Sequence, residues 1–208
     1  MSKLLFLGIL IVSCAPMAFA QSTDDYHKCE FYGGYSHNRV DTGGGTSVIT
    51  DREGFNGFDT AVTGNITRYV GLKVDFAGHF KNKSIQLSPP SSARVDIDSS
   101  LYNFLGGVQL KDNSTETRFK PFAQALVGLA HGRNKVEFID VICIAVVPSP
   151  CSNFTETDTG FAGAFGGGLD IRAGSRFDIR AIQIDYNPTR LFDSTQHNFR
   201  IGAGIVIH

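Results

Sequence analysis

The most regular pattern in the chain is an alternation of apolar and polar positions with a period of two. It is clearest between Tyr69 and Phe80. Successive residues of an extended chain point to opposite faces, whereas a helix would scatter the same charges around its surface. The two faces of this segment hold Val70, Leu72, Val74, Phe76 and Phe80 on one side and Lys73, Asp75 and His79 on the other. The pattern predicts a strand with one apolar face.

Seven further segments show the same alternation. They lie at about 29–36, 58–66, 102–110, 119–131, 161–172, 177–186 and 199–207. In segment 177–186 the parity slips, because Asp178 and Arg180 occupy even positions while Gln183 and Asp185 occupy odd ones. A β-bulge near Ala181 restores a single polar face. The chain is therefore expected to form eight strands of about 11 residues each.

The connections between these segments alternate in length. The longer ones are His37–Gly57, Lys81–Ser99, Gly132–Asp158 and Asn187–His197, and the short ones are Ile66–Arg68, Lys111–Glu116 and Ala173–Ser175. In an antiparallel meander, odd-numbered connections leave at one end and even-numbered connections at the other. Long loops at one end and tight turns at the other are typical of outer-membrane barrels. The predicted fold is all-β, an eight-stranded antiparallel up-and-down transmembrane β-barrel.

The polar row decides between a membrane barrel and a soluble, lipocalin-like barrel, which is the alternative. Its charges are mixed in sign and alternate with Gly and Ala, which suits a narrow lumen better than a water-facing sheet. The predicted lumen charge network consists of Glu30, Asp59, Lys73, Asp75, Asp178, Arg180, Asp185 and Arg200. Aromatic residues near strand ends are expected to form girdles at the two interfaces: Tyr69, Phe80, Tyr102, Phe119, Phe177, Tyr186 and Phe199. The apolar row then faces lipid.

The first twenty residues have the features of a secretory signal peptide. Lys3 precedes an apolar run, and Ala18-Phe19-Ala20 supplies a cleavage pattern before Gln21. The expected domains are a signal peptide at 1–20 and an outer-membrane barrel domain at 21–208. The alternative is a lipoprotein signal that places a lipid on Cys14. A formal net charge of −1 argues against a nucleic-acid partner, and 42% hydrophobic residues argue against disorder.

Two cysteines lie eight residues apart in the longest loop. A disulfide between Cys143 and Cys151 is possible in an oxidising compartment, and two unpaired thiols are the alternative. The apolar stretch Val141–Val147 lies in the same loop. It is expected to extend a neighbouring strand, and a sticky patch for a partner is the other reading.

Four short motifs together resemble the OmpA-type outer-membrane β-barrel superfamily. They are Phe31-Tyr32-Gly33-Gly34-Tyr35-Ser36, Gly71-Leu72-Lys73-Val74-Asp75-Phe76, Gly166-Gly167-Gly168-Leu169-Asp170 and Gln183-Ile184-Asp185-Tyr186. The resemblance covers essentially the whole mature chain. It implies a barrel that anchors, stabilises or decorates the outer membrane, with Glu30, Lys73, Asp75 and Arg180 in the interior cluster. The chain departs from the family at its end, because Val206-Ile207-His208 lacks the usual terminal aromatic residue.

Catalytic and metal chemistry is not expected. His37, His79, His131 and His197 lie near the looped end, but parity puts His131 on the opposite face from His79, so no metal site is predicted. His79 and Ser36 are candidates for the base and nucleophile of a lipid-modifying enzyme, yet no third orienting residue is evident. No Gly-rich stretch precedes a helix with a phosphate-binding lysine.

The sequence therefore predicts a non-enzymatic outer-membrane barrel with a structural or surface-interaction role and without an open pore. Two alternatives remain, a barrel that binds or passes a small apolar ligand at its extracellular rim and an outer-leaflet lipid enzyme. The long loops are expected outside the cell and the termini in the periplasm. The expected partners are outer-membrane lipid, lipopolysaccharide and the barrel-assembly machinery, but no nucleic acid and no cofactor. The chain is expected to be a monomer.

Overall fold

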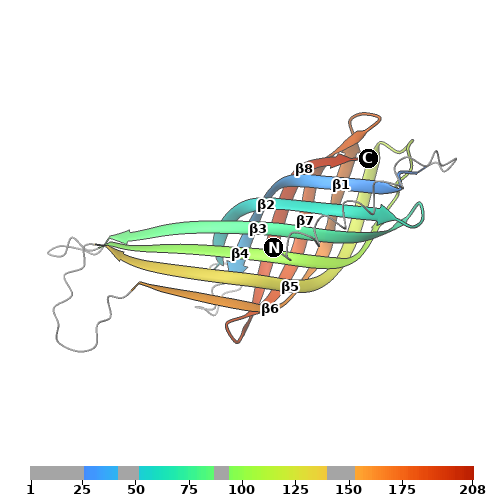
Figure 1. Ribbon diagram of the computed structural model, residues 1–208. Coiled ribbons are helices and arrows are strands. Elements are labelled where there is room, and N and C mark those ends of the chain that lie inside the picture. Colours follow the sequence, from blue (N-terminus) through green and yellow to red (C-terminus); the bar gives the residue numbers. More distant parts are fainter. Residues whose placement is uncertain (1–25, 42–51, 87–93, 140–152) are drawn as a thin grey trace, which may run out of the picture.

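The computed structural model describes residues 26–41, 52–86, 94–139 and 153–208, which form one closed barrel (Figure 1). The predicted signal peptide, Cys14, Cys143, Cys151 and the stretch 141–147 lie outside the described residues. No helix in the described part of the chain is long and apolar enough to span a membrane. The strands are β1 (Cys29–Asp41), β2 (Arg52–Asn65), β3 (Val70–Gln86), β4 (Arg94–Lys111), β5 (Phe119–Ile139), β6 (Phe154–Arg172), β7 (Phe177–Leu191) and β8 (Ser194–Ile207).

Each strand pairs antiparallel with the next, and β1 pairs with β8 to close the barrel. This confirms the predicted fold. The short connections after β2, β4 and β6 lie at the end where β8 finishes, which we call the terminal end. At the opposite end, which we call the extended end, β3 to β6 reach farther than the other strands (Figure 1).

The two rows of side chains face as the alternation predicts. Apolar residues of the outward row are exposed, for example Leu72 at 55% and Phe104 at 55%, whereas Lys73 and Asp75 in the inward row are 1% and 0% exposed. The outward apolar residues make a continuous surface, which we call the apolar belt. The β-bulge expected near Ala181 is confirmed, because the β7–β8 register shifts between Arg180 and Gln183.

The predicted strand lengths are wrong. The strands contain 13 to 21 residues instead of about 11. They extend into the predicted loops, so that β3 runs to Gln86 and β4 starts at Arg94, where a connection from 81 to 99 was expected. The predicted connection 187–197 is a two-residue turn, Phe192 and Asp193, with φ of 51° and 57°. Two positive φ values fit a hairpin turn that follows the twist of its strands.

The strand ends were predicted wrongly because the alternation of apolar and polar positions reverses beyond the barrel wall. Four strand segments continue beyond the barrel wall as a sheet, which we call the extension: 81–86, 94–99, 132–139 and 154–160. There the outward row turns polar, with Asn82, Ser84 and Thr157, whereas apolar residues such as Ile85 and Val136 appear in the inward row beside polar ones. The period of two persists, but the apolar positions move to the other face.

Candidate functional site

The lumen holds all eight charges that were predicted for its network. Each of them is at most 2% exposed, and three further charged residues, Lys111, Lys120 and Asp170, lie among them. Together the buried set has five cations and six carboxylates: Lys73, Lys111, Lys120, Arg180 and Arg200 with Glu30, Asp59, Asp75, Asp170, Asp178 and Asp185. Near-balance of charge is needed because an unpaired ion in the lumen would be very costly.

Arg200 of β8 is the centre of the network at mid-barrel. Its guanidinium group lies 2.9 Å from an Asp75 oxygen, 2.9 Å from an Asp185 oxygen and 3.6 Å from an Asp59 oxygen. These carboxylates come from β3, β7 and β2, so the cation links strands on opposite sides of the lumen. Gln183 also donates to Asp59 and Asp185, which satisfies more of their acceptor capacity.

A second group of ion pairs lies closer to the terminal end. Arg180 binds Asp170 with an N–O distance of 2.8 Å, and Lys111 bridges Asp170 and Glu30 at 3.1 and 2.6 Å. The guanidinium of Arg180 also lies 4.2 Å from the ring centre of Tyr32 and 4.1 Å from that of Phe122. Cation–π contacts at these distances add to the ion pair and fix the side chain across the lumen.

The sequence parity indicates an inward position for Lys120, whereas the predicted strand end concealed that of Lys111. Lys120 pairs with Asp178 at 2.9 Å, and its even position is that of Gln124, an inward residue of the same strand. Lys111 was placed at the start of a predicted turn, yet it ends β4 with its side chain buried. Lys73, expected in an ion-pair network, instead donates to the amide oxygen of Gln124 at 2.7 Å.

Ser36 and His79, the candidate nucleophile and base, are in contact. Ser36 Oγ lies 2.9 Å from His79 Nε2. Both residues are 0% exposed, and no hydrogen-bond partner is present for His79 Nδ1 in the described residues. A lipid substrate would have to enter the closed lumen to reach this pair. Ser36 therefore belongs to the row of small inward residues.

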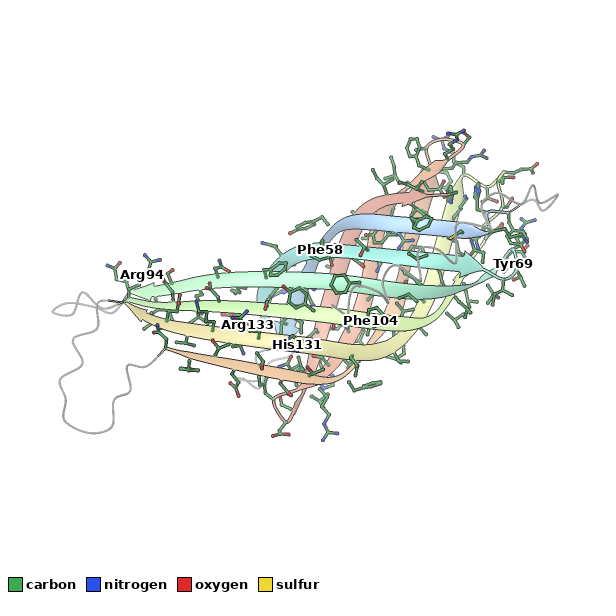
Figure 2. The ribbon with its side chains drawn as sticks, viewed as in Figure 1. Phe58, Tyr69, Arg94, Phe104, His131 and Arg133 are labelled. Atoms are coloured by element: carbon green, nitrogen blue, oxygen red, sulfur yellow. The ribbon has the colours of Figure 1, made fainter. Side chains whose placement is uncertain are left out.

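The four histidines near the extended end do not converge. His79 is buried in the lumen, whereas His131 is exposed on the outer surface beside Arg133, as Figure 2 shows. His37 contacts Asn56, and His197 contacts Tyr186. Within the described residues, no group of three or more His, Cys, Asp or Glu side chains is arranged to hold a metal ion.

The second candidate region is the inward face of the extension. Ile85 and Phe154 are 42% and 51% exposed there, and the apolar side chains are Ile85, Val95, Ile97, Val136 and Phe154. Cross-strand pairs such as Ile97 with Val136 make this surface continuous. Sequence reasoning missed it, because these residues were assigned to loops.

The apolar face continues from the extension into the adjoining part of the lumen. A buried apolar cluster lies there and includes Val40, Phe55, Leu101 and Leu191, with Phe192 packed against it. Lys81 and Lys83 border the face on β3 and form ion pairs with Glu53 at 3.2 and 2.9 Å. On the β6 side, Asp158 accepts a hydrogen bond from the backbone N–H of Phe192. The extension thus presents an apolar strip between charged borders.

Comparison with known proteins places the fold. The structure of Ail, the attachment invasion locus protein of Yersinia pestis, in complex with the heparin analogue sucrose octasulfate is 20% identical to this chain. The match covers 86% of this chain and 97% of Ail, with a TM-score of 0.55. A second structure of Ail gives 19% identity, the same coverage and a TM-score of 0.54. No protein-family model matches the sequence, and no curated protein matches it.

The fold is therefore that of the small eight-stranded outer-membrane β-barrels. This confirms, at the level of the fold, the resemblance to OmpA-type barrels that four short motifs suggested.

Proposed function

We propose that this protein is a non-enzymatic barrel of the bacterial outer membrane whose surface-interaction role is carried by the extension of β3 to β6. In the proposed orientation the extended end faces the outside of the cell and the terminal end faces the periplasm. The lumen is a packed scaffold without an open pore, since ion pairs and the apolar cluster fill it. The barrel acts as a monomer and needs no cofactor.

The observation that carries this proposal is the reversal of the two faces where the extension leaves the barrel. Phe80 and Tyr102 are the last outward aromatic residues of β3 and β4, and the outward positions beyond them are Asn82 and Ser100. A polar outer face means that the extension stands in water beyond the membrane. A rigid sheet that projects from the surface is a suitable place for contacts with partners.

The lipid partners in this proposal are outer-membrane lipid and lipopolysaccharide. Arg39, Arg133 and Arg190 are exposed one or two outward positions beyond the apolar belt, where lipid phosphates lie. The barrel-assembly machinery is the partner that would insert the chain. The absence of catalysis in the proposal is supported by the full burial of Ser36 and His79.

Labelling of single cysteines on intact cells tests the orientation. In a background with Cys29, Cys143 and Cys151 replaced by serine, Thr157→Cys reports the extension and Ser175→Cys the terminal end. A polyethylene-glycol maleimide too large for porins should modify Thr157→Cys on intact cells, and Ser175→Cys only after lysis. The reverse pattern would overturn the proposed orientation.

The absence of catalysis has its own test in a Gram-negative host. Mass spectra of lipid A from cells with and without the protein should be identical. A new lipid A species that disappears in the His79→Ala variant would contradict the non-enzymatic assignment.

A second candidate function is the binding of a small apolar molecule on the inward face of the extension. It is favoured by the exposure of Ile85 and Phe154 and by the continuity of this face with the apolar cluster below. The chain has no Trp, so Phe154→Trp provides a single fluorescent site. A brominated fatty acid should quench this Trp and spare a control Trp at Thr157 on the polar face. Equal quenching at both positions would exclude specific binding.

A further inference from the structure

The same pair of residue types occurs where each odd-numbered strand begins. A cation and an aromatic residue lie within two positions of each other along the chain at each of four places: Tyr26 and Lys28 before β1, Arg68 and Tyr69 before β3, Arg118 and Phe119 at the start of β5, and Arg176 and Phe177 at the start of β7. We call these four pairs the cation–aromatic steps. All odd strands begin at the terminal end, so the steps surround that end of the barrel (Figure 1).

Three of the four steps contain a cation–π contact. The Lys28 amine lies 4.2 Å from the ring centre of Tyr26, and the guanidinium carbon atoms of Arg68 and Arg118 lie 5.2 and 5.8 Å from the adjacent ring centres. These distances are within the usual cation–π range of about 6 Å. An arginine that rests on a ring keeps N–H donors at its edge free for another acceptor.

The rings lie at the border of the apolar belt. Tyr69, Phe119 and Phe177 are 56%, 57% and 42% exposed on the outward surface, and Figure 2 shows Tyr69 at the terminal end. Aromatic side chains prefer the membrane–water interface, and a cation one residue beyond them lies at the depth of lipid headgroups. The steps therefore place positive charge at the level of lipid phosphates.

Two of the steps lack a carboxylate partner within the described residues. Arg68 donates two hydrogen bonds to Asp112 at 2.8 and 3.0 Å, which neutralises its charge. Arg118 and Arg176 have no ion pair to a described carboxylate, and both are exposed. The turn from Ala173 to Arg176 contains no acidic residue. The positive charge of these two arginines is thus available to a ligand.

From this geometry we propose that the Arg118 and Arg176 steps bind the phosphate of glycerophospholipids and select anionic headgroups over zwitterionic ones. A guanidinium group matches a phosphate by paired hydrogen bonds, and the adjacent ring packs against the glycerol and upper acyl chain. A zwitterionic headgroup brings its own cation, which competes with the arginine. In the proposed orientation the terminal end faces the periplasm, so this lipid lies in the inner leaflet of the outer membrane. That placement rests on the proposed function, whereas the selectivity does not depend on the orientation.

Quenching of a single Trp by brominated lipids tests the selectivity locally. The reporter is Phe119→Trp, which keeps an aromatic ring in its step, and the matched reporter at the extended end is Phe199→Trp. Each is folded into phosphatidylcholine vesicles containing equal fractions of acyl-brominated phosphatidylglycerol or acyl-brominated phosphatidylcholine. Correct folding of each variant is checked by heat-modifiable migration in a detergent gel.

Phosphatidylglycerol should bind beside Phe119→Trp about threefold more strongly than phosphatidylcholine at low salt, and less so at high salt. In Arg118→Gln/Arg176→Gln the ratio should fall to about one, whereas Arg118→Lys/Arg176→Lys should keep part of it. The Phe199→Trp reporter should not respond to these substitutions. Equal quenching by both lipids in the parent, or a preference that survives the glutamine substitutions, would overturn the proposal.

The outcome is separate from that of the orientation test. In each vesicle the brominated lipid is present in both leaflets, so the assay measures selectivity whichever way the barrel inserts. If the cell-surface labelling fails while the quenching preference holds, only the leaflet assignment changes.

Discussion

The barrel wall and the extension are parts of the same strands, yet their two faces have opposite chemistry. In the wall, Leu72 and Phe104 point outward while Lys73 and Asp75 are buried inside. In the extension, polar residues such as Thr157 point outward, and the apolar residues lie on the inward face among polar ones. The alternation alone predicts a strand, and only the direction of its apolar row shows whether lipid or water surrounds it.

The difference extends to the ion pairs of the two regions. The wall holds its charges in a closed lumen, where Arg200 serves three carboxylates. The extension holds exposed pairs, such as Lys135 with Glu137, whose side chains are 38% and 35% exposed. Burial makes the loss of one partner expensive in the lumen, whereas solvent compensates for it in the extension.

Removal of the central cation is expected to have the largest effect. Arg200→Met leaves three carboxylates buried without their shared cation, and the free energy of unfolding should fall by about 3–5 kcal/mol. The matched substitution in the extension, Lys135→Met, should cost about 0–1 kcal/mol. Both values can be measured by urea unfolding from lipid vesicles. Equal losses in the two variants would show that the lumen network does not stabilise the barrel.

A lysine placed on the outward face should separate the two regions next. Val127 lies in the middle of the apolar belt and is 49% exposed, so Val127→Lys should cost about 2–4 kcal/mol. Thr157→Lys on the outward face of the extension should change stability by less than about 0.5 kcal/mol. The same urea titration measures both. A small cost at Val127 would contradict the placement of the belt in lipid.

The sequence predicted the number of strands, their faces and the bulge of β7, because each depends on local parity. The change of parity between Asp178 and Arg180 on one side and Gln183 and Asp185 on the other was enough to locate the register shift. The prediction of the strand ends failed, because a strand was expected to continue only as long as its outward row was apolar. Where Ile85, Ile97 and Val136 appear on the other face, the strand continues although the outward apolar row ends.

The pairing of charged side chains in the lumen could not be predicted from the sequence, for a different reason. Parity shows that Glu30 and Lys73 point inward, but not at which height along the barrel each side chain reaches the axis. The stagger of the barrel brings Lys111 to Glu30 and leaves Lys73 with Gln124. The apolar strip of the extension was missed because its residues were read as loop.

The smallest predicted effect concerns the turn at the terminal end. The hydrogen bond from Arg68 lowers the pKa of Asp112 to about 2. Since the unfolded value is about 3.9, the pair stabilises the fold above about pH 4, and this stabilisation is lost as the pH falls through about 2. The pair is exposed, so Asp112→Asn should cost only about 0.5 kcal/mol at pH 7. Unfolding titrations of both proteins should converge toward pH 2, and a constant difference would contradict the assignment.

We infer that the surroundings of the outward row change from lipid to water along a single strand. Spin labels at Leu72 and Val74 in the belt and at Ser84 in the extension, all on β3, test it directly in vesicles. We expect oxygen, which concentrates in lipid, to relax the labels at 72 and 74, and a water-soluble nickel complex to relax the label at 84. Strong relaxation by the nickel complex at 72 and 74 would show that the belt faces water.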